Sequence, residues 1–149
     1  MTQSNVAGFG TVIVLVASNT FPAGILITQF SDDVDAVDLP GVKISDLAMG
    51  VNGDLIKWSR AAVLPASIGV IPGSNDDINL SILAEANRVG QGKVSAQDII
   101  TLTITYPDGT ATVLSQGSIT DAPFGKSIAG TGREKSKVYV FGFQNRIGF

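Results

Sequence analysis

Carboxylates are the side chains in this chain whose spacing first suggests chemistry. Four of them lie close together in the sequence: Asp32, Asp33, Asp35 and Asp38. Paired carboxylates can cleave glycosidic bonds, but such an enzyme also needs a cleft with aromatic platforms for the sugar. An acidic loop can also bind calcium, yet this stretch lacks the Asp-x-Asp-x-Asp-Gly order and the closing glutamate of an EF-hand loop. We therefore interpret residues 31–40 as a solvated acidic loop.

The residue types that are absent exclude several kinds of site. Among 149 residues there is no histidine and no cysteine. A Ser-His triad, an imidazole metal site, a thiol nucleophile and a disulfide framework are therefore excluded. An enzyme would have to use carboxylates, a Ser-Lys pair or tyrosine, and no spacing supports any of these. We expect no catalytic residue, no cofactor and no metal.

Basic residues gather near the C-terminus. With 10 basic and 13 acidic residues the formal net charge is −3, unlike that of a strongly basic nucleic-acid-binding domain. The cluster also lacks interleaved aromatic residues on which bases could stack. Either it lies on a solvated loop, or it faces the acidic loop of a neighbouring copy. Its members are Lys126, Arg133, Lys135 and Lys137.

Charge is scarce and unevenly distributed. Charged residues make up 15% of the chain, and the first of them is Asp32. A chain of this kind can hide its uncharged surface against copies of itself. Alternatively, it is a low-charge β protein that presents serine, threonine and asparagine to water. The apolar run at residues 9–17 has no preceding Lys or Arg, so we interpret it as a strand rather than a signal peptide, and we expect no membrane insertion.

Most of the remaining pattern is typical of strands. Unbroken or alternating apolar runs separated by Gly, Pro and Asn predict antiparallel pairing. The run at 11–16 is interpreted as buried on both faces, whereas 98–106 alternates between isoleucine or leucine and threonine. The expected strands are 11–16, 24–30, 42–51, 54–63, 65–71, 98–106, 112–120 and 137–143.

The stretch from 42 to 63 predicts a long β-hairpin arm. Asn52-Gly53 is a strong hairpin signal, because a two-residue turn needs positive φ at both positions. The only tryptophan, Trp58, lies near the tip with Met49 and Leu55. In a lone domain a tryptophan is usually part of the core, but on a hairpin tip it would anchor an interface.

One helix is predicted at about residues 76–89. Ser74 or Asn75 can cap it, Asp76 and Asp77 suit the dipole of its first turn, and Gly90 can end it. The predicted fold is mainly β, an antiparallel β-sandwich or partly closed barrel with one flanking α-helix, in a single domain spanning residues 1–149.

Five stretches and their order resemble the tail tube proteins of contractile-tailed bacteriophages. The resemblance covers nearly the whole chain, although no single stretch is specific by itself. The stretches are Met49–Asp54, Pro72–Leu80, Thr103–Gly109, Gly117–Asp121 and Gly132–Phe141.

This resemblance implies a structural virion protein made in the host cytoplasm. Six copies would form a ring, and stacked rings would form the hollow inner tube through which the genome is ejected. The implied partners are the contractile sheath protein, the baseplate or tail initiator, the tail terminator, the tape measure protein and the transiting DNA. The N-terminal stretch and the last strand would contact neighbouring copies.

The resemblance also implies roles for particular residues. A hairpin arm would reach the next ring through Leu47, Met49, Val51, Asn52, Gly53, Asp54, Leu55 and Trp58. The acidic and basic clusters would supply charged contacts between subunits. A lumen that does not grip DNA should be neutral or slightly acidic, since attraction to phosphates would slow transit. Thr101, Thr103 and Thr105 are the candidate lining, though this face could instead meet solvent or the helix. The alternatives are another tail or baseplate protein and a ligand-binding β-sandwich.

Overall fold

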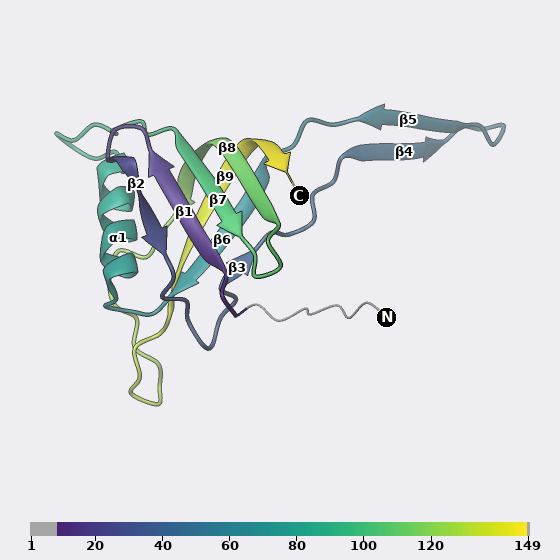
Figure 1. The fold of residues 1–149 in the computed structure, drawn as a ribbon. Helices are drawn as coiled ribbons and strands as arrows, with labels where there is room; N and C mark the ends of the chain where they lie inside the picture. The colour runs from purple at the N-terminus through teal and green to yellow at the C-terminus, as the bar shows by residue number, and fades with distance from the viewer. Residues whose placement is uncertain (1–8, 149) are drawn as a thin grey trace, which may run out of the picture.

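In the computed structural model of this chain, residues 9–148 are described. Seven strands form one antiparallel sheet in the order β2-β1-β7-β8-β9-β6-β3, and the other two, β4 and β5, form a separate hairpin (Figure 1). The strands of the large sheet are β1 (Val12–Ala17), β2 (Phe21–Ile27), β3 (Val37–Asp38), β6 (Leu64–Val70), β7 (Ile100–Thr105), β8 (Ala111–Asp121) and β9 (Lys137–Gly148). The mainly β fold class predicted from the sequence is confirmed.

The large sheet curves until its two sides meet at one end. Just beyond β2, Phe30 forms an antiparallel bridge with Val70 at the end of β6. The amide of Ser31 donates to Gly69 O (3.1 Å), and that of Ile71 donates to Gln29 O (3.1 Å). Among the described residues these are the backbone contacts that join the two sides, so the barrel is only partly closed.

The core fills the concave side of this sheet. Each strand contributes the residues of one face, as the period of two requires. The predicted alternation in β7 is confirmed, since Ile100, Leu102 and Ile104 are fully buried and the threonines between them are not. The other fully buried large side chains are Ile13, Leu15, Ile27, Ile68, Leu80, Leu83, Tyr139, Phe141 and Phe143.

The first strand differs from its prediction. In β1, Ile13 and Leu15 are buried, but Val14 is 37% exposed on the convex face. The interpretation of this run as buried on both faces is therefore wrong. Nothing in the described part of the chain covers the convex side of β1, because the single helix packs against the concave side. A β-branched run in a sheet that is covered on one face only has the same sequence pattern as a strand that is buried on both faces.

The helix α1 (Asn75–Asn87) closes the open side of the barrel beside β2 (Figure 1). Ser74 is its N-cap, and the Ser74 hydroxyl accepts from the amide of Asp77 (3.2 Å). The helix ends two residues before its predicted end because Arg88 is already extended. Leu80, Leu83 and Ala84 face the core.

Gly117 lies where β8 bulges, and we expect it to tolerate no side chain. A Cβ there would lie 2.2 Å from Cδ1 of Phe143 and 2.8 Å from the carbonyl oxygen of Gly142. Because the Phe143 ring is fully packed in the core, Gly117→Ala should lower the free energy of unfolding by about 1–3 kcal/mol. Urea unfolding measures this loss. Gly125→Ala, where nothing lies within 4 Å of the added Cβ, is the matched control, and equal midpoints for the two variants would contradict the packing argument.

Candidate assembly surface

The hairpin of β4 (Ser45–Met49) and β5 (Leu55–Ser59) is an arm that projects away from the body of the molecule (Figure 1). Its strands pair from Ser45 with Ser59 out to Met49 with Leu55. Residues 50–54 make the turn, in which the amide of Gly53 donates to Gly50 O and that of Gly50 donates to Asp54 O. The predicted arm is present. However, only Gly53 has positive φ in this turn. The prediction of a two-residue turn formed by Asn52 and Gly53 is therefore wrong.

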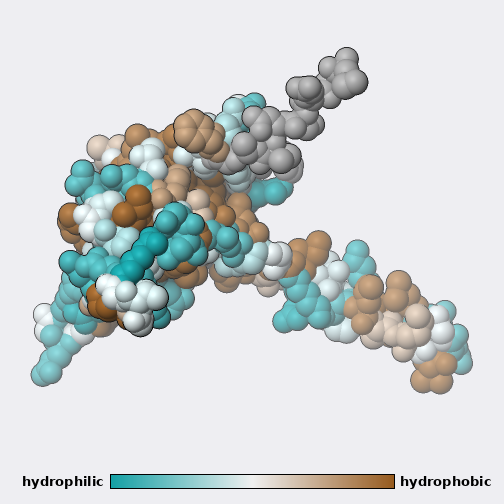
Figure 2. Space-filling model, turned by 90° about the horizontal axis from the view of Figure 1, so that it is seen from below, coloured by the Kyte–Doolittle hydropathy of each residue, from teal (hydrophilic) through white to brown (hydrophobic). Residues whose placement is uncertain are grey.

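Both faces of the arm carry exposed apolar side chains, because cross-strand partners and alternate residues share a face. One face, here called the lysine face, consists of Leu47, Met49, Leu55 and Lys57, with Ser45 and Ser59 at its root. The opposite face, here called the tryptophan face, consists of Ala48, Ile56 and Trp58, with Asp46 beside Trp58 at the root of the arm. Trp58 is 49% exposed and Leu55 is 62% exposed, so the interpretation of Trp58 as a core residue is excluded. Apolar surface covers much of the arm out to its end (Figure 2).

Ion pairs hold the root of the arm together. Asp46 accepts from Lys43 (2.5 Å) and from Arg60 (3.2 Å). The amide of Arg60 also donates to Ile44 O (2.9 Å). These contacts join the two chain segments where they leave the body. Beyond them, only the pairing of β4 with β5 supports the arm, and an isolated two-stranded hairpin is marginally stable in water.

The acidic loop and part of the basic cluster meet within one chain. Arg133 donates to Asp32 (2.6 Å), and Ser136 and Ser31 both donate to Asp33. The hydrogen bond from Arg133 lowers the pKa of Asp32, and those from Ser136 and Ser31 lower the pKa of Asp33. These hydrogen bonds hold the loop after β2 against the loop before β9. Contacts of these residues between copies stay a prediction.

The remaining charged candidates divide into paired and unpaired groups. Lys137 pairs with Asp77 (3.2 Å) inside the body, and Lys126 lies 3.5 Å from Glu134. By contrast, Asp35, Asp38 and Lys135 form no ion pair through their side chains with any residue in the range 9–148. These three charges are the ones left available to a second molecule.

The candidate lining threonines lie on the convex face of the sheet. Thr103 stands opposite Val14 of β1 and Val113 of β8. The same row continues outward to Leu26 on β2 and Ile147 on β9. Thr101 and Thr105 lie on the same face, opposite Val16 and Val12. This part of the surface is uncharged across five strands.

Buried carboxylates fix the ends of the elements; sequence reasoning did not name Asp98 and assigned Asp76 and Asp77 to the helix dipole alone. Asp98 accepts from the amides of Asn19 (2.7 Å) and Thr20 (2.9 Å), from the Thr20 hydroxyl and from the Asn87 side chain (2.8 Å). Asp76 similarly accepts from the amides of Thr28 and Gln29, both at 2.8 Å. These contacts tie α1 and the start of β7 to the two ends of β2.

Asp77 occupies a third such position. Its carboxylate accepts from the Tyr139 hydroxyl (2.7 Å) and the amide of Gly73 (2.9 Å). Burial raises the pKa of Tyr139, and Asp77 also raises it. The tyrosine therefore stays protonated as a hydrogen-bond donor, and the cluster supports the fold rather than proton transfer.

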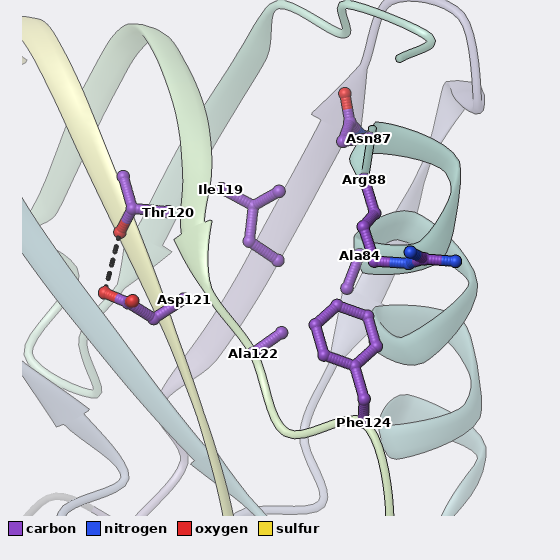
Figure 3. Close-up of a pocket in the computed structure, with 8 residues that line it drawn as sticks. All are labelled: Ala84, Asn87, Arg88, Ile119, Thr120, Asp121, Ala122 and Phe124. Carbon is purple, nitrogen blue, oxygen red and sulfur yellow. Dashed lines mark hydrogen bonds between the residues drawn. The ribbon is translucent and has the colours of Figure 1, made fainter. Parts of the chain in front are cut away.

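A small pocket of about 150 Å³ lies between the end of α1 and β8 (Figure 3). Phe124 and Ala84 lie on one side of it, with Ile119 and Ala122 on the other. Arg88 lies over the Phe124 ring at 5.9 Å and is held by two hydrogen bonds to Glu85. At its edge the Thr120 hydroxyl donates to the Asp121 carboxylate (3.3 Å), and both side chains are exposed to solvent.

Two further kinds of site are absent from residues 9–148. No cluster of three acidic side chains in this range could hold a metal ion. The same range also contains no helix with the length and apolar character needed to cross a lipid bilayer.

Comparison with known proteins places the chain among tail components. A family model described as tail fiber protein gp32 matches residues 4–147. No curated protein sequence matches the chain.

Solved structures with the same fold come from contractile injection systems. A chain of the PVC sheath/tube terminator in its extended state is 12% identical with a TM-score of 0.64, over 100% of this chain and 99% of the other. A chain of the anti-feeding prophage baseplate is 12% identical (TM-score 0.58, 100% and 97% covered). A chain of the PVC sheath-tube complex is 14% identical (TM-score 0.55, 92% and 87% covered).

Proposed function

Because the chain belongs to the tail fiber protein gp32 family, a family of phage-type tail components, we propose that it is the subunit of an inner tail tube. Six copies form a ring, and rings stack into a hollow tube inside a contractile sheath. The tube is bounded by baseplate and terminator proteins, and it houses the tape measure protein before the genome passes. The role is structural and involves no catalysis.

The observation that carries this proposal is the arm with its two apolar faces. A free monomer would leave both faces in water, although each large apolar side chain gains about 1.5–3 kcal/mol when it is fully buried. A single flat partner could cover only one of the faces. An arm inserted between two neighbouring molecules covers both, as a subunit within a stack of rings requires. In this arrangement Val51, Asn52, Gly53 and Asp54 lead the arm into the next ring.

The uncharged part of the convex face, from β2 to β9, supports the second part of the proposal. Thr101, Thr103 and Thr105 stand among valines and small residues on this face. Such a surface offers no cation to DNA phosphates, so it would not impose salt-dependent drag on a passing genome. We propose that this face lines the lumen.

Electron microscopy of the purified chain at high concentration tests the proposal. We expect rings and hollow tubes with six-fold end views in negative stain. A seeded sample containing baseplate rings separates slow initiation from an inability to assemble. Persistent monomers in the seeded sample would contradict the tube assignment.

A single-ring role is the second candidate. The likeness to the terminator chain, at a TM-score of 0.64 over 99% of that chain, favours a ring at one end of the tail. The same micrographs distinguish the two roles, because a terminator or baseplate subunit gives single rings that do not stack.

A further inference from the structure

An asparagine followed by a glycine lies at the outer end of the arm (Figure 1), where Asn52-Gly53 forms part of the turn between β4 and β5. The backbone of this turn requires only the glycine, because Gly53 has a φ of 86° and Asn52 does not have positive φ. Asn52 is exposed, and no hydrogen bond holds its side-chain amide to another residue in the range 9–148. The side-chain carbonyl carbon of Asn52 is therefore accessible to attack.

The nucleophile for such an attack is the next residue in the chain. The backbone nitrogen of Gly53, once it loses its proton to solvent, can attack Cγ of Asn52 and expel the side-chain nitrogen as ammonia, which closes a succinimide ring. Water then opens the ring at either carbonyl and leaves aspartate or isoaspartate. No oxidant or reductant takes part. Glycine favours the ring closure because it has no Cβ to obstruct the close approach of its backbone.

The closed turn restrains this reaction. The amide of Gly53 donates to Gly50 O (2.9 Å), and the amide of Gly50 donates to Asp54 O (2.7 Å). The Gly53 nitrogen must leave its hydrogen bond before it can reach Cγ of Asn52. Only the pairing of β4 with β5 supports the turn, and an isolated two-stranded hairpin is marginally stable in water. Opening of the arm is therefore the step that admits the reaction.

A second turn in the chain has the same backbone pattern and a firmer support. Between β7 and β8, the amide of Gly109 donates to Tyr106 O (3.1 Å), and that of Tyr106 donates to Thr110 O (2.9 Å). Gly109 also has positive φ. Asp108 takes the place of the asparagine, and its carboxylate accepts from the amide and the hydroxyl of Thr110. Both flanking strands have a further neighbour, since β7 pairs with β1 and β8 pairs with β9.

We propose that Asn52 is a site of self-modification, which deamidates spontaneously in the free chain at a rate set by the opening of the arm. The product adds one negative charge to a chain whose formal net charge is −3. The new carboxylate lies two residues before Asp54, and the isoaspartyl form also lengthens the main chain of the turn by one carbon. This reaction requires no second molecule except water.

The effect on assembly rests on the proposed function. In a stack of rings, residues 51–54 lead the arm into the next ring, so a carboxylate formed there would be buried against a neighbour without a partner, which is costly. Neighbours that cover the arm also hold its turn closed and so protect Asn52. Free subunits therefore lose the ability to assemble with age, whereas assembled subunits stay intact.

Peptide mass spectrometry of the aged free chain tests the modification. Full-length Asp108→Asn protein, which has the same dipeptide in both turns, is kept below its assembly concentration at mildly alkaline pH. The peptide containing Asn52 should gain one mass unit at least about tenfold faster than the peptide containing the substituted position, because the arm opens more readily than the sheet. Equal rates in the two turns would overturn control by the arm.

The wild-type chain contains its own reference for the same measurement. Asn75 and Asn145 are also exposed, but neither is followed by glycine. Both should remain unmodified over the time in which Asn52 converts, and anion exchange should separate the converted chain as a more acidic species. An Asn52 that stays intact under these conditions would overturn the site.

Seeded assembly of partly aged protein tests the consequence. Aged free chain is mixed with baseplate rings, and the modified fraction at Asn52 is compared between sedimented tubes and supernatant. We expect modified chains in the supernatant and unmodified chains in the tubes, and chains aged inside tubes should stay unmodified. Equal fractions in the two samples would overturn the effect on assembly. If fresh, seeded wild type does not assemble, the proposed function fails together with that effect, while the modification of the free chain still stands on its own test.

Discussion

Leu55→Asp combined with Trp58→Asp is expected to abolish assembly while the body of the molecule stays folded. The two side chains lie on opposite faces of the arm and are 62% and 49% exposed, so the monomer loses little packing. In the assembly each substitution removes about 1.5–3 kcal/mol of burial and also places a carboxylate in an apolar interface. When the free energy of assembly falls by more than about 4 kcal/mol per subunit, the subunit concentration needed for assembly rises about a thousandfold.

Sedimentation and negative-stain microscopy measure this loss, and circular dichroism measures the fold. Val94→Asp is the control, because Val94 is also apolar and is even more exposed, at 86%, but lies in a loop far along the chain from the arm. Tubes formed normally by the double variant would contradict the role of the arm. Unfolding of the double variant would instead show that the monomer depends on the arm for stability.

The largest effect on stability is expected from Asp98→Ala. The substitution removes an acceptor that serves the amides of Asn19 and Thr20 and the Asn87 side chain. Donors left unsatisfied in a buried site cost about 1–3 kcal/mol each, partly offset where water enters. We expect a loss on the order of 3 kcal/mol and a fall in Tm of roughly 6–12 °C. Asp35→Ala, which removes an exposed and unpaired carboxylate, is the control in the same thermal scan.

The same carboxylate makes stability depend on pH. Burial raises the pKa of Asp98, but hydrogen bonds from Thr20, Asn87 and Asn19 outweigh burial and hold the pKa below its usual value. A carboxyl whose pKa is lowered by folding stabilises the protein above its unfolded pKa, near 3.9, and loses that contribution as the pH falls toward the folded pKa. The stability difference between wild type and Asp98→Ala should therefore shrink between about pH 5 and pH 3. A constant difference in urea titrations over this range would contradict the assignment.

The elements of this fold could be predicted because their signals are local. Alternation in β7 follows from the period of two, and the Ser74 cap lies immediately before the helix that it starts. The turn of the arm shows where local reasoning fails. A longer turn with one left-handed glycine at Gly53 also matches the twist of the strands, so Asn52 does not need positive φ.

The charged contacts could not be predicted in this way. Arg133 and Asp32 are 101 residues apart, and they meet because the long loop before β9 lies against the loop after β2. Asp98 acts on Asn19 and Thr20 across a similar separation. In the sequence each of these aspartates resembles any other turn residue. Only the pairing of the strands places donors around Asp98 and leaves the Asp38 side chain without an ion pair among residues 9–148.

The two-faced arm also has a kinetic consequence. When two copies first meet, an arm buries only one face and its tip stays in water, so the dimer gains only part of the burial that a completed stack provides. Small oligomers are then disfavoured relative to both monomer and long assembly. Growth of this kind shows a lag phase and a sharp threshold concentration, and preformed ends remove the lag. The time at which a tail begins to grow would then be set by the appearance of a template, rather than by the amount of subunit in the cell.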